Sequence, residues 1–535
     1  MIARSYFFLL ILLFASIKLY AKDCTINENR TNFDVLHYRL NIYFDTLNKS
    51  LTGNVQIKAV YQSNQKLPIQ IDAQSPLKIT KVTQSGKILK LKQNEDAYMI
   101  YLDENIQKED TFTILIQYYG TPRTAVKPPW DGGMVIQKDE NNIIWWAIAC
   151  QGIGASIWFP CKDVQDDEPD EGVDLFYTVP NKLSAIGNGR LIDTIQRNDN
   201  LVTWHWMVAA PINLYNITFY IGDYVSWEEK MNGLKGNLNL SYYVLRNKLS
   251  KAKKHFSMVP EMIQIFEDWM GPYPFYEDGY KLVEAPYLGM EHQSAVAYGN
   301  KFQLGYLGSD RSKTGVGNLF DFIIVHESGH EWFGNNISMK NSADFWIHEG
   351  FTSYSEVMYI ESKFGKEQSM KYLKGTRALI KNELPLINSK DSCQNENTDN
   401  YPKGANLVHI IRLLMNNDNA FKILLSKMNQ QFYHQTVDSK EIETFISKES
   451  NLKLDKVFDQ YLRTALLPKL NITKNKNGFI YQWQECVKGF DMPVILKVNG
   501  IKQWFYPTDI PKEHIQKDIK SISLNDEFYC DFQLN

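Results

Sequence analysis

The stretch from Val325 to Glu349, VHESGHEWFGNNISMKNSADFWIHE, constrains this chain more than any other part of it. It opens with the pattern HExxH, whose two histidines are His326 and His330. On an α-helix, residues four apart lie one turn apart on the same face, so both imidazoles can reach one ion. Histidines spaced in this way also occur as ordinary, partly buried residues of an amphipathic helix. The pattern favours a zinc site, in which the two histidines bind and Glu327 is the general base.

Glu349 completes a ligand set for that ion. Eighteen residues separate it from His330. A zinc ion held by His326, His330 and Glu349 has three protein ligands and keeps a fourth position open for water. Structural zinc sites are usually closed by four protein ligands. The sequence therefore predicts one catalytic zinc per chain.

Length and composition bound the remaining possibilities. A chain of 535 residues is too long for one ordinary core and suggests about three domains. Hydrophobic residues at 44% and charged residues at 22% are typical of globular proteins. The formal net charge of −3 argues against a nucleic-acid partner, because no basic field is present to neutralise phosphates.

The first residues resemble a targeting segment. A short basic region, Met1 to Arg4, precedes the apolar run YFFLLILLFASI, and Leu19-Tyr20-Ala21 offers a cleavage site. We expect residues 1–21 to be a signal peptide, with an uncleaved signal anchor as the alternative. No second apolar run approaches spanning length. The mature chain is thus expected to be exported, periplasmic or secreted, without an integral membrane segment.

Cysteine usage fits an oxidising compartment without forming a dense disulfide framework. The six cysteines show no C-x-x-C spacing, which makes them poor metal ligands. Cys486 and Cys530 share the C-terminal segment and could pair, although six cysteines allow 15 connectivities.

Residues 22–245 have the pattern of strands. Tyr38, Leu40, Ile42 and Phe44 alternate with polar residues, and the segments 201–208 and 215–221 are also strand-like. We predict a large antiparallel β-domain with one buried and one solvated face.

The period changes at about residue 246, and residues 246–466 are expected to form an α-rich catalytic domain that contains the zinc motif. Pro468 closes its last helix, and 467–535 returns to short strands as a small C-terminal β-unit that needs its neighbour for support. The predicted fold is multidomain α+β. The expected helices are 249–256, 260–270, 318–333, 348–364, 404–416 and 454–466.

Several motifs in the right order resemble those of the zinc aminopeptidases of the aminopeptidase N family, the gluzincin group that includes leukotriene hydrolase. HESGHEWFGN followed by FWIHEGF is very similar to the HExxH-x18-E block of the family. LGMEH at 288–292 resembles its GxMEN exopeptidase motif, YPKGA at 401–405 its YxKG motif, and WFPCKD at 158–163 its FPCxD segment. The resemblance implies a thermolysin-like catalytic domain and a metallo-aminopeptidase that releases single residues from peptides with a free N-terminus.

The resemblance also implies roles for residues outside the zinc stretch. Glu291 would pair with the α-amine of the peptide, and the phenol of Tyr401 would donate a hydrogen bond to the oxyanion. Gln151, Gly289 and Met290 would contact the substrate, and Glu356 would orient a ligand histidine. Three of these residues also have an ordinary structural interpretation: a salt bridge for Glu291, a core position for Tyr401, and a solvated helix face for Glu356.

The sequence departs from the family pattern at three points. Leu288 stands where the first glycine of GxMEN is expected, and His292 replaces its asparagine, with expected effects on subsite shape or pH dependence. Many members also carry a long helical C-terminal domain that covers the active site, whereas the sequence after Pro468 has the pattern of strands.

Other functions compete with the aminopeptidase interpretation. A non-catalytic scaffold would have lost zinc ligands, an endopeptidase would accept blocked N-termini, and an epoxide hydrolase would share the same motifs. Retention of all three ligands together with Glu327, Glu291 and Tyr401 favours the aminopeptidase.

Overall fold

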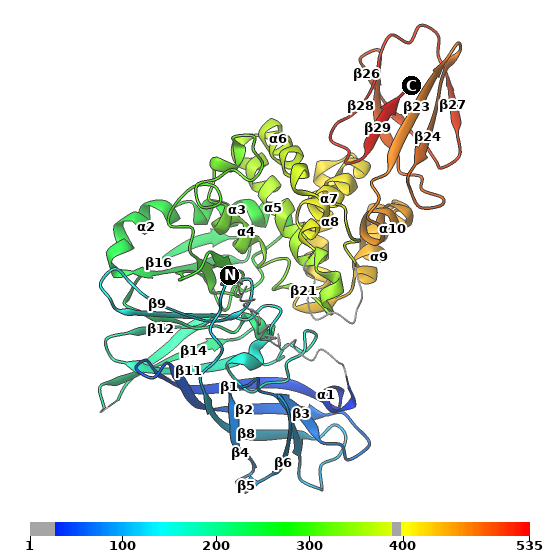
Figure 1. Cartoon of the computed structure of the whole chain (residues 1–535). Helices are drawn as coiled ribbons and strands as arrows, with labels where there is room; N and C mark the ends of the chain where they lie inside the picture. Colours follow the sequence, from blue (N-terminus) through cyan, green and yellow to red (C-terminus); the bar gives the residue numbers. More distant parts are fainter. Residues whose placement is uncertain (1–26, 198, 388–396) are drawn as a thin grey trace, which may run out of the picture.

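The computed structural model describes residues 27–197, 199–387 and 397–535, which form three bodies in chain order (Figure 1). Sheets make the first body, helices dominate the second, and a small β-unit projects at the C-terminal end. The expected signal peptide at 1–21 lies outside the described residues. None of the described helices is long and apolar enough to cross a membrane.

An eight-stranded sheet forms the base of the N-terminal body. Its strand β1 (Phe33–Asp45) buries alternate side chains, as a period of two predicts. Most neighbouring strands are antiparallel, as predicted, and β1 and β11 are a parallel pair. Parallel neighbours need a long connection, which the chain between these two strands supplies. In spatial order the sheet contains β13 (Arg190–Gln196), β14 (Leu201–Val208), β11 (Val173–Pro180), β1, β2 (Ser50–Tyr61), β8 (Thr111–Gly120), β4 (Lys78–Gln84) and β5 (Lys87–Ile88).

Two smaller sheets complete this body. One contains β12 (Ser184–Ile186), β15 (Tyr220–Gly222), β10 (Ile144–Ala149) and β9 (Gly133–Lys138), and the other β3 (Ile69–Asp72), β7 (Ala97–Tyr101) and β6 (Lys90–Asn94). The strand predicted at 215–221 is mostly wrong, because only its last two residues belong to β15. The Asn213 side chain accepts a hydrogen bond from the Tyr215 amide and caps a 3₁₀ turn at Leu214–Asn216 instead.

A five-stranded sheet lies between the two hydrophobic cores of the molecule. Its order is β16 (Tyr224–Gly233), β17 (Gly236–Leu245), β18 (Tyr280–Glu284), β20 (Val296–Tyr298) and β19 (Gly289–Met290). Along β17, Leu240, Tyr242 and Val244 pack into the core of the helical body. Tyr243 and Leu245 point the other way, into the core of the N-terminal body. This sheet therefore joins chain segments on both sides of residue 245.

The helical body contains most of the predicted helices. Pro260 lies in the first turn of α3 (Val259–Met270), and Gly271, with φ of 92°, ends that helix. The helix predicted from residue 318 begins later, because Asp321 caps α4 (Phe322–Gly329) by accepting from the Ile324 amide. The others are α2 (Leu249–Phe256), α5 (Trp346–Phe364), α6 (Lys366–Thr376), α7 (Pro402–Met415), α8 (Asp418–Gln431), α9 (Ser439–Ser450) and α10 (Asp455–Arg463), with α1 (Glu28–Thr31) near the N-terminus and the paired strands β21 (Ile337–Met339) and β22 (Gln435–Val437).

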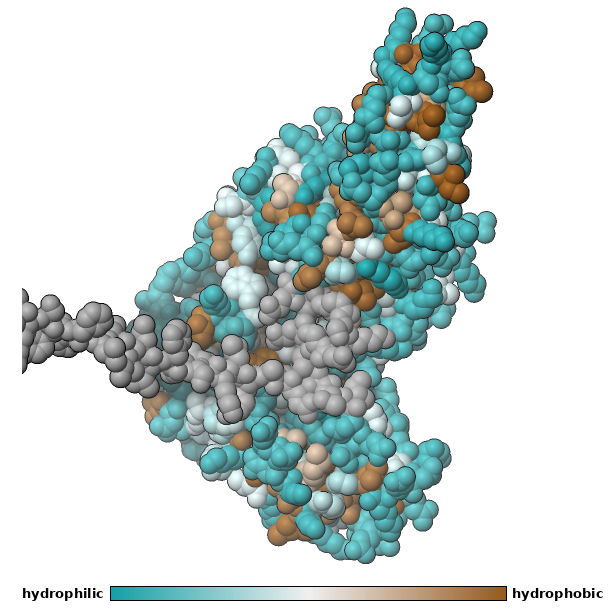
Figure 2. All heavy atoms as spheres, turned by 45° about the vertical axis from the view of Figure 1, so that its right-hand side comes forward, coloured by the Kyte–Doolittle hydropathy of each residue, from teal (hydrophilic) through white to brown (hydrophobic). Residues whose placement is uncertain are grey.

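The C-terminal unit consists of two small sheets. They contain β27 (Lys512–Ile515), β24 (Gly478–Gln484), β23 (Lys469–Asn475) and β29 (Asp531–Leu534), and β26 (Ile501–Phe505), β25 (Val494–Val498) and β28 (Ile522–Leu524). Its buried side chains continue the core of the helical body, and the Tyr461 hydroxyl donates to the Tyr529 carbonyl across the junction. Cys486 and Cys530 are separate thiols, so the suggested pairing is absent. Figure 2 shows a mostly hydrophilic surface with scattered hydrophobic side chains.

Candidate metal centre

Two helices bring the three predicted metal ligands together. His326 lies in the last turn of α4, His330 is the residue that ends this helix, and Glu349 lies in the first turn of α5. The Oε2 atom of Glu349 is 3.4 Å from Nε2 of His326 and 3.5 Å from Nε2 of His330. All three side chains are buried. One donor atom from each lies within 4.8 Å of the others, which is a spacing that one ion can bridge.

The outer nitrogen of each histidine is held by a hydrogen-bond partner. Nδ1 of His326 lies 2.7 Å from Oε1 of Glu356, and Nδ1 of His330 lies 2.9 Å from the Phe333 carbonyl oxygen. Because a carbonyl only accepts, Nδ1 of His330 carries the proton and its Nε2 presents a lone pair. This is the usual way in which a protein fixes the tautomer of a metal-binding histidine.

The donor set fits zinc. Oε2 of Glu349 is buried without a hydrogen-bond partner among the described residues, a costly arrangement that a cation would relieve. Burial opposes ionisation of Glu349, yet the neighbouring His330 and His326 hold the pKa of this carboxyl below its usual value. Two imidazole nitrogens and one carboxylate are a common ligand set of catalytic zinc, which keeps one position open.

Glu327 lies beside this group, between the two histidines in the sequence. Burial raises the pKa of its carboxyl to about 7, opposed by His326 and reinforced by Glu291. The backbone of Gly289 approaches it so closely that a Cβ there would lie 2.7 Å from Oε1 of Glu327. A side chain at position 289 would therefore displace this carboxylate, which explains the need for glycine.

The carboxylate of Glu291 is held by two residues of the N-terminal body. Its Oε1 accepts hydrogen bonds from Nε2 of Gln151 and, at 3.1 Å, from the Tyr215 hydroxyl. Burial raises the pKa of this carboxyl, the neighbouring His330 lowers it, and Glu349 raises it. The carboxylates of Glu291 and Glu327 and a nitrogen of His330 also lie within 4.8 Å of one another. An ammonium group would be attracted to this concentration of negative charge.

Tyr401 lies beside the metal donors, immediately before α7. Its ring stacks against His326 at 5.8 Å between centroids. Burial raises the pKa of the phenol well above its usual value, and Glu349 and Glu291 add to this effect, so the hydroxyl stays protonated and able to donate.

These side chains line a cavity of about 400 Å³. Its lining includes every residue to which the sequence analysis gave a site role except Glu356. It also includes Trp130, which is 68% exposed at the rim.

Sequence reasoning missed Tyr215, for which no motif exists, and Thr352, whose hydroxyl is 3.1 Å from Nδ1 of His330. The spacing of Thr352, three residues after Glu349 on one helix, is a signal that was available. His292 does not line this cavity, and its Nδ1 lies 2.7 Å from the Tyr220 hydroxyl.

Comparison with protein families identifies the part of the chain that carries this centre. Residues 255–461 match the family model described as "Peptidase family M1 domain". This part of the chain is a peptidase family M1 domain. It includes all three metal donors, Glu327, Glu291 and Tyr401, and it lies inside the range 246–466 that the sequence predicts as catalytic.

Curated relatives share more than the M1 domain. Endoplasmic reticulum aminopeptidase 1 of Mus musculus is 23% identical over 343 residues, which cover 61% of this chain and 35% of that protein. Leukotriene A-4 hydrolase of Xenopus laevis is 24% identical over 329 residues, 57% of this chain and 50% of that protein. The matched part thus spans about a third to a half of these relatives. The resemblance indicated by the sequence motifs is confirmed at the level of the family.

Solved structures with an M1 domain share the fold. An M1 zinc metallopeptidase from Deinococcus radiodurans, in a mutant form bound to the substrate Tyr-Ser-Ala, aligns with a TM-score of 0.66 at 20% identity, covering 78% of this chain and 91% of that one. A two-domain M1 zinc metallopeptidase bound to L-tryptophan aligns with a TM-score of 0.65 at 19% identity over the same shares. The predicted α+β architecture is confirmed by these likenesses and by the structure itself.

Proposed function

We propose that the protein is a zinc-dependent aminopeptidase that removes the N-terminal residue of peptides. The observation that carries this proposal is Glu291, whose buried carboxylate lies against the metal donors without a cationic partner of its own among the described residues. A protonated α-amine bound there would place the first peptide bond beside the metal.

Zinc held by His326, His330 and Glu349 would act as a Lewis acid, polarising the scissile carbonyl and lowering the pKa of water toward ~7. Glu327 takes a proton from the attacking water and later delivers it to the leaving amine. The Tyr401 hydroxyl donates a hydrogen bond to the oxyanion that forms from the carbonyl. Gln151 and Tyr215 hold Glu291 in place, and Gly289 and Met290, which line the cavity, would contact the first residue of the peptide.

A comparison of free and blocked peptides tests this function. The zinc-loaded protein is assayed with a panel of aminoacyl-arylamides, and with one peptide whose N-terminus is free or acetylated, with and without a chelator. We expect release of the first residue from the free peptide only, and loss of activity with the chelator. Equal cleavage of the acetylated peptide would mean an endopeptidase and would remove the role of Glu291.

We infer that the protein is exported, periplasmic or secreted, and breaks down peptides there after removal of residues 1–21. Support comes from the apolar segment in the sequence and from the endoplasmic reticulum location in the name of a relative. N-terminal sequencing of the mature protein should begin near Lys22, and an intact Met1 in the exported fraction would contradict cleavage.

A further inference from the structure

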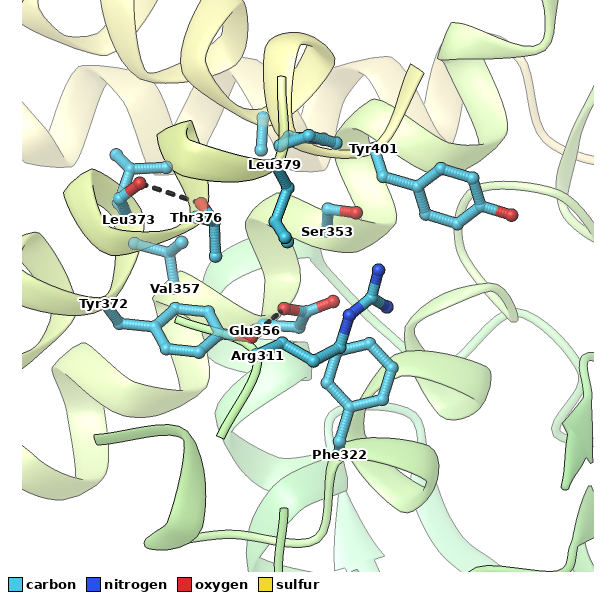
Figure 3. Close-up of a pocket in the computed structure, with 12 residues that line it drawn as sticks. Arg311, Phe322, Ser353, Glu356, Val357, Tyr372, Leu373, Thr376, Leu379 and Tyr401 are labelled. Atoms are coloured by element: carbon cyan, nitrogen blue, oxygen red, sulfur yellow. Dashed lines mark hydrogen bonds between the residues drawn. The ribbon is translucent and has the colours of Figure 1, made fainter. Parts of the chain in front are cut away.

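A second, smaller cavity adjoins the metal centre on the side of Tyr401. It has a volume of about 30 Å³, and Tyr401 lines both this cavity and the larger one. Figure 3 shows the guanidinium of Arg311 reaching into this space from its own loop, between Phe322, Glu356 and Tyr401. None of the motifs in the sequence includes Arg311.

Arg311 has a positive charge without a carboxylate partner among the described residues. Its guanidinium carbon lies 5.2 Å from the ring centroids of both Phe322 and Tyr306. The nearby carboxylate of Glu356 is already used, since Oε1 contacts Nδ1 of His326 at 2.7 Å and Oε2 accepts from the Tyr372 hydroxyl at 2.6 Å. The donors of Arg311 are thus oriented by aromatic rings and remain available to an anion.

The two histidines give the direction in which a bound peptide extends. Glu291 lies near His330, with a carboxylate oxygen within 4.8 Å of a nitrogen of that ring. Phe322, which supports Arg311, stacks on His326 at 5.1 Å. His326 and His330 are one helical turn apart, so Glu291 and Arg311 lie at opposite ends of the metal centre. A peptide whose amine is at Glu291 and whose first carbonyl is at the metal directs its second residue toward Arg311.

We propose that Arg311 binds a carboxylate on the second residue of the substrate. This carboxylate is either an acidic side chain or, in a dipeptide, the C-terminal group, and the inference rests on the proposed aminopeptidase function. Guanidinium and carboxylate form paired, charge-assisted hydrogen bonds. A space of about 30 Å³ is large enough to hold water, so a carboxylate enters by replacing solvent at the guanidinium.

Two matched pairs of substrates test the proposal and separate the two sources of the carboxylate. Each pair has the same first residue, the one preferred in the arylamide panel. The first pair is X-Asp-amide and X-Asn-amide, and the second is X-Ala with a free or an amidated C-terminus. The zinc-loaded full chain is compared with Arg311→Gln and with Lys313→Gln, an exposed cation of the same loop that does not line the cavity.

The readout is the ratio of kcat/KM within each pair. We expect the acidic member of at least one pair to be favoured about fivefold, mainly through KM, as for one partly exposed ion pair. Arg311→Gln should bring that ratio to about 1, Arg311→Glu should invert it, and Lys313→Gln should keep it. The pair that responds identifies the side chain or the C-terminal group as the source.

A ratio of about 1 in the native protein, or a ratio that survives Arg311→Gln, overturns the inference. Arylamide hydrolysis is measured in every sample, because this substrate has no second residue with a carboxylate. Intact arylamide activity with equal ratios rejects the role of Arg311 alone. If the protein hydrolyses none of the aminoacyl substrates, both the proposed function and this inference are rejected.

Discussion

The carboxylate of Glu327 lies in a buried setting that keeps its affinity for protons high. A base with a pKa near the working pH is the most effective one for accepting and returning a proton. We therefore expect Glu327→Gln to lower kcat by about a thousandfold. Zinc content should not change, because none of the three donors is altered. Elemental analysis beside kcat checks both statements, and native turnover in the variant would remove Glu327 as the base.

Glu356 acts on the metal centre only through His326. Its Oε1 is 2.7 Å from Nδ1 of that ring, on the side away from Glu349. Glu356→Gln should weaken zinc binding about 10- to 100-fold, because a neutral partner makes the imidazole a poorer ligand. Tyr372→Phe removes only the hydrogen bond to Oε2 of Glu356 and serves as the milder control. Titration against a chelator of known affinity measures both, and equal affinities in all three proteins would contradict this role.

Glu284 on β18 makes stability depend on pH. Burial raises the pKa of its carboxyl from 4.5 to about 7, against the hydrogen bond that it accepts from the Leu245 amide. Between these two pH values the unfolded chain loses the proton first, so the free energy of unfolding falls as pH rises and stays low above pH 7.

The variant Glu284→Gln has no titratable group at this position, so it loses the contribution of Glu284 to the pH dependence of the free energy of unfolding. The loss of unfolding free energy between about pH 5 and pH 8 should be smaller by roughly 2 kcal/mol in the variant. Urea unfolding at both pH values measures it, with the exposed Glu367→Gln as a matched control. Identical pH dependence in native protein and Glu284→Gln would show that the group does not titrate in this window.

Motifs predict residues that share a local sequence pattern. They do not predict contacts between segments that are distant in the sequence. HExxH and the glutamate that follows after eighteen intervening residues predict three donors that the structure brings within 4.8 Å of one another. The hydroxyl of Tyr215 reaches Glu291 across 76 positions of the chain, and only the fold creates that contact. The same holds for Arg311, because Phe322 comes from α4 and Tyr401 from the residue before α7.

At the scale of elements, strong periodicity predicts most helices and strands well. The segments 249–256 and 201–208 match α2 and β14 residue for residue. The prediction omitted α8, although Phe421, Leu424, Leu425 and Met428 have helical spacing and Asn417 caps the first turn. The predicted zinc helix, 318–333, is longer than α4 at both ends, and the cap Asp321 sets its later start.

The crossing of α5 and α7 explains two glycines of the motifs. A Cβ on Gly404 would lie 2.7 Å from the Cα of Gly350, so the two backbones touch where these helices cross. Gly350 follows Glu349, and Gly404 lies near Tyr401, so this contact fixes the distance between a metal ligand and the oxyanion donor.

Gly404→Ala should therefore separate α7 from α5. We expect a loss of about 1–3 kcal/mol in stability, as for other overpacked positions, and a lower kcat because Tyr401 moves with α7. Thermal unfolding and arylamide hydrolysis measure the two effects. Lys371→Ala, on the exposed face of α6, is the control. Native activity in Gly404→Ala would mean that α7 adjusts without moving Tyr401.

At the scale of the whole molecule, the five-stranded sheet couples the N-terminal and helical bodies. Successive residues of β17 enter different cores, so neither core is complete without this sheet. The change from strand to helix pattern at residue 246 follows the end of β17, but the packing continues across it. The sequence pattern gives the spacing of hydrophobic residues within one strand, but not the core into which that strand packs. The shared sheet could therefore not be predicted from the sequence.

This shared sheet leads to a prediction about metal removal. Zinc bound by α4 and α5 stabilises the folded state by mass action, by about 2.7 kcal/mol at a hundred times the dissociation constant. Because the sheet is common to both cores, we expect the two bodies to unfold together and chelation to lower the midpoint of that common transition. Scanning calorimetry with and without a chelator measures the shift. In Glu349→Ala, which lacks one ligand, the chelator should have little effect. A separate transition of the N-terminal body that keeps its midpoint after chelation would show that the sheet does not couple the cores.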